Sequence, residues 1–399
     1  MTGHEKQNMA DLFVDAGFVS LNKHGEQLCG DHVEITTGEG AGTVIVLADG
    51  LGSGVKANIL STLTSKIIST MMANNLPISE CVSTIAATLP VCEYRRIAYS
   101  TFTILRIADD RRAEIIQYDN PKVVMLRDGQ IVEYECRESL VDGKRILYSE
   151  LEVRERDTFL LISDGVTHAG VGGLLDFGWQ REGLLAFLEE HYEPELTSKV
   201  LCRMVTDECN RYYEDRPGDD TTVCAVRLRA RRYINLMMGP PSDSARETEM
   251  LSTFFSMRGK HVVCGGTTAS LIARYLGREV DTSHSFYIDP DIPPIAEIEG
   301  VDLVTEGAIT MNRVLEHARN YLEQNDRYWE WTGRQDGAAL VARMLFEEAT
   351  DIVFFIGRAV NPAHQDETFA IKFNFKMRIV KDLSRCLQAM GKNITVKYY

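Results

Sequence analysis

The sequence predicts two consecutive domains: a strand-rich α+β domain over residues 1–230, then a Rossmann-like α/β domain with a mostly parallel sheet over 231–399. Length supports this prediction, because 399 residues exceed the ~100–200 residues of a typical domain. Charge supports it too: the formal net charge is −15, of which −13 falls in 1–230 and −2 in 231–399. The change occurs at a short basic stretch, residues 227–232.

The composition excludes several classes of protein. An acidic chain without a long Lys/Arg cluster is unsuited to nucleic acid, whose binding depends on neutralising phosphates. The apolar runs are shorter than the ~20 residues of a membrane-spanning helix, and the polar N-terminus does not resemble a signal peptide. Nine cysteines, an odd number without a C-x-x-C pair, indicate reduced thiols rather than zinc ligands. We therefore expect a cytoplasmic protein without nucleic-acid or membrane partners.

The first domain is predicted to combine apolar strands with two pairs of helices. Strands are expected at 43–48, 97–107, 113–118, 122–126, 131–135, 146–153, 158–163 and 222–228. Helices are expected at 56–72, 79–89, 181–191 and 196–212. Three glycines within 50–54 force a tight turn before the first helix. The apolar residues of that helix fall on one stripe, as in an amphipathic helix: Ile59, Leu60, Leu63, Ile67 and Met71.

Aspartates adjoin the ends of the strands in this domain: Asp31, Asp49, Asp164, Asp219 and Asp220. Carboxylates at the ends of buried strands are costly unless something neutralises them. Without Cys or His partners they are hard oxygen ligands, which suit Mg²⁺ or Mn²⁺. Two such ions can share a carboxylate and activate a water for attack on phosphorus. The alternative is that each Asp-Gly pair only forms a turn, which explains one pair better than the whole set.

The ordered motifs resemble those of the metal-dependent protein phosphatases of the PP2C superfamily. The motifs are Gly30-Asp31, ADGLGSG at 48–54, ISDG at 162–165 and GDDTT at 218–222. Between them, residues 99–103 look like the family's Ser-Thr-Phe strand, and residues 120–121 and 126–130 look like its Pro turn and hairpin. The bacterial sporulation stage II E (SpoIIE) branch is the most similar, over residues 25–230.

The resemblance implies an α/β-β/α sandwich with two Mn²⁺ or Mg²⁺ ions at one end. By this resemblance Asp49 bridges both ions with the help of the Gly50 carbonyl, and Asp164 and Asp219 hold them from other strands. Asp31 binds or orients a metal-bound water, and Asp220 supports the ligands. The expected catalytic residues are therefore Asp31, Asp49, Asp164 and Asp219. A water between the ions would hydrolyse phosphoserine or phosphothreonine directly, without a covalent phospho-enzyme.

Some positions depart from the family pattern. Leu51 stands where eukaryotic relatives often have His, so the sequence assigns no general acid. His168 replaces the usual Glu, either as a functional group or as an ordinary turn residue. Arg95 and Arg96 are either phosphate-binding groups or exposed loop residues. The Gly-rich apolar segment 165–179 is, by the resemblance, a candidate switch.

The second domain alternates strands and helices with short joints, which predicts a mostly parallel sheet with right-handed crossovers. Strands are expected at 233–238, 260–264, 301–304, 351–356 and 393–398. Helices are expected near 244–257, 265–276, 307–323, 337–348 and 372–390. In such sheets ligands bind at the carboxyl ends of strands. A small anionic ligand is one hypothesis there, and glycines that only let strands turn into helices are the other. The candidate ligand-binding residues are Gly265, Gly266, Thr267, Thr268 and Arg358.

The sequence therefore predicts a protein serine/threonine phosphatase followed by a domain that senses a ligand or a partner. The resemblance implies a phosphorylated regulator, of the anti-sigma-factor-antagonist type, as substrate, and leaves a homodimer open. The main alternative is a weakly active signalling scaffold that acts through its C-terminal domain. A small-molecule enzyme in the second half is disfavoured, because no nucleophile–base pair is evident there.

Overall fold

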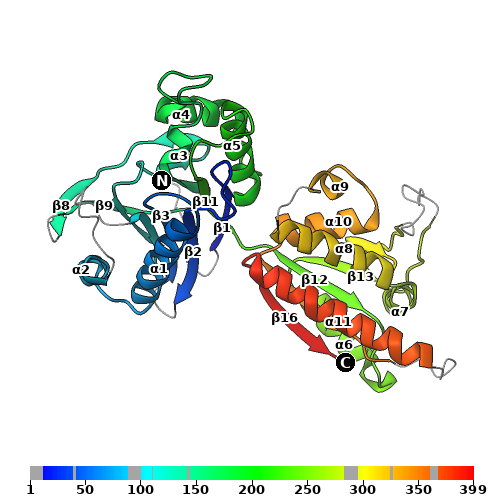
Figure 1. The fold of residues 1–399 in the computed structure, drawn as a ribbon. Helices are drawn as coiled ribbons and strands as arrows, with labels where there is room; N and C mark the ends of the chain where they lie inside the picture. Colours follow the sequence, from blue (N-terminus) through cyan, green and yellow to red (C-terminus); the bar gives the residue numbers. More distant parts are fainter. Residues whose placement is uncertain are drawn as a thin grey trace, which may run out of the picture. The chain divides into compact units, whose positions relative to one another are not determined.

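The computed structural model describes residues 12–38, 42–88, 100–109, 111–141, 144–282, 295–323, 327–359 and 367–399. The chain divides into two compact units, Met1–Ala230 and Arg231–Tyr399. Each unit has its own sheets and its own buried apolar clusters (Figure 1). The two units are therefore described one at a time.

The first unit contains two antiparallel sheets. The six-stranded sheet has the order β2-β3-β4-β5-β9-β8. Its strands are β2 (Asp31–Gly38), β3 (Gly42–Gly50), β4 (Ser100–Ile107), β5 (Arg112–Tyr118), β9 (Lys144–Glu152) and β8 (Arg137–Val141). The five-stranded sheet has the order β1-β11-β10-β6-β7. Its strands are β1 (Leu12–Leu21), β11 (Thr221–Ala230), β10 (Asp157–Ile162), β6 (Val124–Arg127) and β7 (Gln130–Val132).

The two sheets pack face to face with helices on both outer faces (Figure 1). Between the sheets lie apolar side chains such as Leu47 and Leu105 from one sheet and Phe159 and Val226 from the other. Helices α1 (Gly54–Ala73) and α2 (Ile78–Thr88) cover the outer face of the six-stranded sheet. Helices α4 (Gln180–His191) and α5 (Ser198–Tyr212) cover the five-stranded sheet. The predicted α/β-β/α sandwich is thus confirmed.

Three strands of this sandwich were not predicted: β1, β2 and β8. Strand β1 contains Asp15 and Gly17, which interrupt its apolar pattern. Pairing with β11 along all ten residues overrides this weak local signal. Gly17 is required there, because a Cβ would lie 3.0 Å from the backbone nitrogen of Lys199 in α5. Strand β2 is an edge strand whose outer residues are polar, so its apolar alternation is weak.

Helix α1 forms as predicted, but only part of its predicted apolar stripe packs on the sheet. Leu60 is buried, and Ile67 and Met71 pack against the same core from partly buried positions. The buried face carries Ala57, Leu60, Ile68 and Met72 together with small polar residues, namely Ser61, Thr64, Ser65 and Ser69. Ile59 and Leu63, from the predicted stripe, are 53% and 48% exposed. Several of the buried hydroxyls are satisfied within the helix; for example, Thr64 donates to the Leu60 carbonyl at 2.8 Å. The predicted stripe therefore overlaps the packed face only in part.

The second unit is an all-parallel sheet with the order β14-β13-β12-β15-β16. The strands are β12 (Tyr233–Met238), β13 (Lys260–Cys264), β14 (Leu303–Thr305), β15 (Asp351–Ile356) and β16 (Asn393–Tyr398). The order reverses between β12 and β15, which confirms the predicted Rossmann-like arrangement. The expected strand 97–107 of the first unit begins, within the described residues, at Ser100.

Helices cover both faces of the parallel sheet. On one face lie α8 (Ala308–Leu322), α10 (Gly337–Arg343) and α11 (Glu367–Ala389). On the other lie α6 (Glu247–Ser256) and α7 (Gly266–Leu276). The helix predicted at 337–348 changes to π-helical geometry over Met344–Glu348, and a short helix, α9 (Trp329–Thr332), was not predicted. Within the described ranges, none of the helices has both the length and the apolar character needed to cross a bilayer.

Candidate active site

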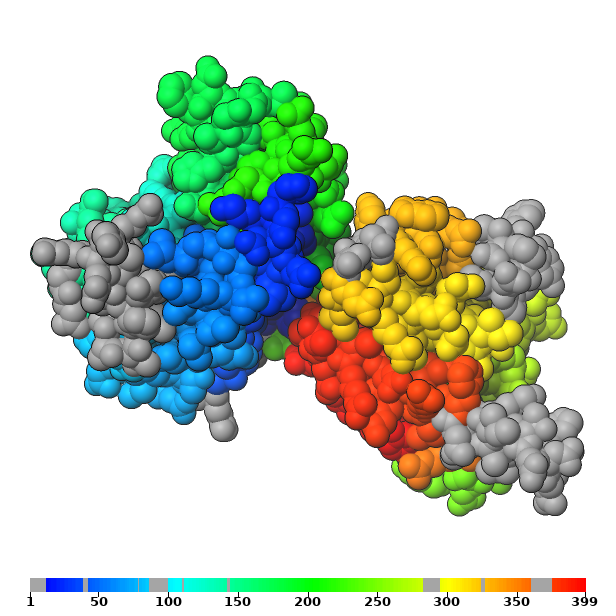
Figure 2. Space-filling view, in the orientation of Figure 1, coloured from blue at the N-terminus to red at the C-terminus, as the bar shows by residue number. Residues whose placement is uncertain are grey.

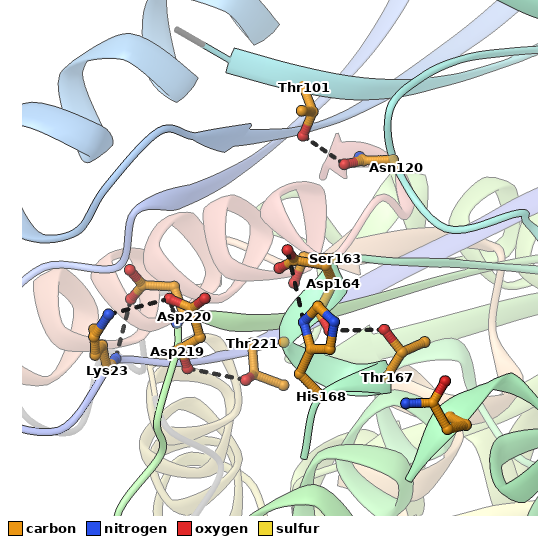
Figure 3. Close-up of polar contacts among 12 residues, drawn as sticks. Lys23, Thr101, Asn120, Ser163, Asp164, Thr167, His168, Asp219, Asp220 and Thr221 are labelled. Carbon is orange, nitrogen blue, oxygen red and sulfur yellow. Dashed lines mark hydrogen bonds and ion pairs between the residues drawn. The ribbon is translucent and has the colours of Figure 1, made fainter. Parts of the chain in front are cut away.

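Five aspartates converge at one end of the first unit, from both sheets. Asp31 begins β2 and is the direct cross-strand partner of Asp49, near the end of β3. Asp164 begins α3 (Asp164–Thr167), one residue after β10 ends. Asp219 and Asp220 form the turn that leads into β11, the neighbour of β10. We call these five residues the aspartate cluster; Figure 3 shows its Asp164, Asp219 and Asp220.

The aspartates of the cluster repel one another. Burial raises the pKa of Asp49, and the charges of Asp31, Asp164 and Asp219 raise it further. Burial also raises the pKa of Asp31, with added repulsion from Asp220 and Asp164. The pKa of Asp164 is raised by burial and by Asp219. Such mutual repulsion shows that the carboxylates share one small region, and it is the pattern expected where a cation binds.

The most buried members of the cluster have unsatisfied oxygen atoms. Asp31 and Asp220 are each only 4% exposed. Neither carboxylate oxygen of Asp31, nor Oδ2 of Asp220, has a hydrogen-bond partner. The hydroxyls of Ser163 and Thr222 lie near enough to favour ionised Asp31, but they do not reach hydrogen-bond geometry. Orphaned buried oxygens of this kind are normally explained by an ion or water.

Three glycines permit the close packing around the cluster. A Cβ on Gly30 would lie 2.6 Å from Oδ2 of Asp220, and one on Gly165 would lie 2.2 Å from the Asp220 carbonyl oxygen. A Cβ on Gly50 would lie 2.1 Å from the carbonyl oxygen of Ala57 in the first turn of α1. The motif glycines are thus needed because backbone segments touch there.

Lys23 is a member of the site that the sequence analysis missed. Its backbone nitrogen donates to Oδ1 of Asp220 at 3.0 Å, and its ammonium lies 3.5 Å from Oδ1 of Asp219 (Figure 3). Lys23 follows β1 in the connection to β2, and neither strand was predicted. No motif marked this lysine, so only the folded chain identifies it.

Other polar residues surround the cluster. Thr101, the cross-strand partner of Asp49, donates to Oδ1 of Asn120 at 2.6 Å (Figure 3). Nδ1 of His168 lies 3.8 Å from Oδ2 of Asp164, with both side chains about half exposed. The Gly50 nitrogen donates to the Gly30 carbonyl at 3.2 Å, whereas the role of the Gly50 carbonyl stays a prediction. Arg95 and Arg96 lie outside the described residues.

The donor set fits hard divalent cations in chemistry, since it consists of carboxylate oxygens. The arrangement is more open than a filled site: no three Asp, Glu, His or Cys side chains of the described residues lie close enough to hold an ion as they stand. The side chains of Asp164 and Asp219 are 45% and 41% exposed, so both can rotate inward.

In the second unit the structure separates the candidate ligand residues into two places. Thr268 accepts from the Gly239 nitrogen at 2.8 Å and donates to the Cys264 carbonyl, so its hydroxyl joins the ends of β12 and β13. Gly265 has φ +111° and begins α7, with Gly266 and Thr267 in the first turn. Arg358 instead is exposed and lies 4.6 Å from the ring of Tyr398 on β16, two strands beyond β12.

A lysine that the sequence analysis did not select lies where the strand order reverses. The ammonium of Lys376 in α11 donates to the Gly357 carbonyl at 2.5 Å. A Cβ on Gly239 would lie 2.7 Å from that ammonium nitrogen, so glycine makes room for it. Burial lowers the pKa of Lys376.

Comparison with known proteins finds one family model that matches, and the match lies within the first unit. Residues 39–229 match the family model described as stage II sporulation protein E (SpoIIE). The match spans all the cluster except Asp31, which lies before it. None of the curated proteins compared matches the chain.

Solved structures resemble the first unit at low sequence identity. The phosphatase domain of the cell fate determinant SpoIIE from Bacillus subtilis is 15% identical, with 55% of this chain and 94% of that chain covered and a TM-score of 0.44. A longer fragment of that protein, which adds part of its regulatory domain, is 16% identical. The match covers 55% of this chain and 64% of that chain, with a TM-score of 0.48. The RsbU and RsbW domains of Rv1364c from Mycobacterium tuberculosis are 12% identical. The match covers 61% of this chain and 67% of that chain, with a TM-score of 0.44.

Proposed function

We propose that the protein is a divalent-cation-dependent protein serine/threonine phosphatase. The proposal starts from the match of residues 39–229 to the SpoIIE family, whose domain is of the PP2C-like phosphatase type. The observation that carries the proposal is the convergence of five aspartates on one end of the sandwich. The pKa values of Asp31, Asp49 and Asp164 are raised, and Asp31 and Asp220 have orphaned oxygens. Such a cluster needs cationic charge to be stable when ionised.

Asp31, Asp49, Asp164 and Asp219, with the Gly50 carbonyl, would hold two Mn²⁺ or Mg²⁺ ions. When bound, the ions would supply positive charge that polarises a phosphoryl group and makes water a better nucleophile. Asp220 fixes the connection between β1 and β2 by accepting from the Lys23 nitrogen. Thr101 and Asn120 hold the end of β4 against the segment after β5. These contacts preorganise the acidic end of the sandwich for an anionic substrate that arrives with cations.

The proposal is tested by hydrolysis of p-nitrophenyl phosphate and a phosphoserine peptide in the presence of Mn²⁺. We expect metal-dependent hydrolysis, and a loss of at least about 100-fold in kcat for Asp49→Asn and for Asp164→Asn. The matched control is Asp128→Asn. Asp128 also precedes a glycine but forms only a hairpin turn and an exposed ion pair with Arg154. It should keep activity within about twofold. Metal-independent or unaltered hydrolysis in the cluster variants would refute the assignment.

We further propose that the second unit senses a small anionic ligand at the carboxyl ends of its strands. The parallel sheet reverses its strand order between β12 and β15, where open α/β sheets bind ligands. Lys376 supplies a cation at that point, next to Gly239 and Gly357. The first turn of α7, with Gly265, Gly266 and Thr267, lies at the end of the neighbouring strand.

We place the protein in the cytoplasm and propose a phosphorylated regulator, of the anti-sigma-factor-antagonist type, as its substrate. The absence of disulfides among the eight described cysteines supports a reducing compartment. The SpoIIE family match supports the substrate class. The scaffold alternative is favoured only by the open arrangement of the cluster, and it predicts little hydrolysis even with Mn²⁺.

A further inference from the structure

One side of helix α1 exposes three bulky apolar residues, whereas its buried side combines apolar residues with small polar ones. Val55, Ile59 and Leu63 are 62%, 53% and 48% exposed. They are spaced by four residues, so they form a single ridge along the helix, which we call the α1 ridge. The buried face opposite includes Ser61, Thr64 and Ser69, which are at most 1% exposed. This is the reverse of the usual surface helix, which turns its polar residues to solvent.

The α1 ridge begins beside the aspartate cluster. Val55 is six residues from Asp49, and Ala57 in the same turn packs against Gly50. A Cβ on Gly30, next to Asp31, would also lie 3.0 Å from the Cβ of Ala57. The first turn of α1 thus sits directly on the glycines that adjoin Asp31 and Asp49. In Figure 2 the surface of α1 lies on the visible face of the first unit.

A second exposed apolar surface lies in the chain segment that follows Asp164 and α3. Val171, Leu174 and Phe177 are 53%, 53% and 82% exposed. They lie in the Gly-rich segment after α3, which we call the 171–177 loop. Gly170 and Gly172, with φ +85° and +72°, shape this loop. Two chain segments that leave different aspartates therefore both present apolar side chains to solvent, which is typical of a surface that binds protein.

We propose that the α1 ridge and the 171–177 loop dock the phosphorylated protein substrate, through an apolar surface next to its phosphoserine. The inference rests on the phosphatase function proposed above. Both surfaces start from segments that adjoin members of the aspartate cluster, since α1 follows Asp49 and the loop follows α3, which begins at Asp164. A partner that contacts both surfaces close to these starting points therefore lies next to the cluster. A second copy of this chain in that position would close the cluster, whereas a substrate brings its phosphoserine to it. Apolar contacts remote from the phosphate then supply binding energy for catalysis.

The test compares two synthetic phosphoserine peptides of equal length. One carries three leucines with the i, i+4, i+8 spacing of a helix beside the phosphoserine, and the other carries serines at those positions. We expect the wild-type protein with Mn²⁺ to hydrolyse the leucine peptide with a kcat/KM at least about tenfold higher. Ile59→Asp and Phe177→Asp should each remove about tenfold of this preference and leave p-nitrophenyl phosphate hydrolysis unchanged.

Leu140→Asp is the matched control. Leu140 is 75% exposed on β8, at the opposite edge of the six-stranded sheet from β2. This variant should behave as wild type with both peptides. Equal rates for the two peptides, or equal effects of Ile59→Asp and Leu140→Asp, would overturn the proposal. If Ile59→Asp instead turns a dimer into a monomer in sedimentation and leaves the peptide preference intact, the ridge joins two copies and the proposal is wrong. Failure of wild type to hydrolyse p-nitrophenyl phosphate would contradict the phosphatase assignment itself.

Discussion

Asp31 and Asp157 are both buried aspartates of the first unit, and their surroundings are opposite. Asp157, with a side chain that is 0% exposed, accepts from Arg127 at 2.8 and 2.7 Å and from the Arg154 nitrogen at 3.0 Å. Asp31 has no hydrogen-bond partner for either oxygen and faces other carboxylates. The first residue stabilises the fold, whereas the second carries a destabilising charge that a cation would relieve.

This contrast predicts opposite effects of the same substitution at the two residues. In EDTA at neutral pH, Asp31→Asn should raise the free energy of unfolding by about 1–2 kcal/mol, because it removes a buried, repelled charge. Asp157→Asn should lower that free energy by about 3 kcal/mol, because it leaves Arg127 partly buried without its counter-ion. Denaturant titration followed by circular dichroism measures both. A loss of stability for Asp31→Asn would contradict a repulsive cluster in the metal-free protein.

At the scale of elements, the loops at the strand ends decide which candidate residues meet. The β12 and β15 ends approach so closely that a Cβ on Gly357 would lie 2.0 Å from the Pro240 carbonyl oxygen. Lys376 reaches this point from α11, far along the chain. Arg358 turns away to Tyr398. An anion at the ends of these two strands would therefore meet Lys376 rather than Arg358.

The anion-sensing proposal predicts that inorganic phosphate stabilises the protein through Lys376. Phosphate at about ten times its Kd should raise the Tm of the second unit's transition by about 3–6 °C. Lys376→Met should abolish the rise. Lys381→Met, on the exposed side of the same helix, should retain it. Scanning calorimetry of the full chain provides the measurement, and a rise that survives in Lys376→Met would place the anion elsewhere.

At the scale of the molecule, each unit has the parts of an independent domain. The first unit encloses an apolar core between its two sheets, and the second builds one on each face of its parallel sheet. All five aspartates of the cluster lie in the first unit. The proposed phosphate hydrolysis would therefore depend on residues 1–230, and the proposed role of the second unit is regulation.

The two-domain organisation predicts that residues 1–230, produced alone, fold and hydrolyse p-nitrophenyl phosphate with Mn²⁺. We expect a kcat/KM within about threefold of the full chain, because the second unit contributes no member of the cluster. Steady-state kinetics and a cooperative thermal transition for the isolated polypeptide would check this. Folded but inactive protein would instead show that residues 231–399 are required for catalysis.

The sequence by itself determined the strands of both sheets that have strong apolar runs, and the motif aspartates at their ends. These features are local: a buried run and an Asp-Gly turn are visible within a few residues. It also identified the alternation of strand and helix that makes the second sheet parallel. The five aspartates meet at one end of the sandwich, while their roles as catalytic residues and metal ligands stay a prediction.

Only the tertiary structure decided the rest, because burial and proximity depend on partners distant in the chain. Strand β1 forms through its pairing with β11, despite Asp15 and Gly17. The face of α1 that packs on the sheet begins with a small residue, Ala57, because Gly50 and Gly30 bring the sheet close to the first turn of the helix. Lys23 and Lys376 joined their sites through loops and helices that carry no motif. Periodicity predicts that a helix is amphipathic, but the packing of the helix on its neighbours determines which side chains are buried.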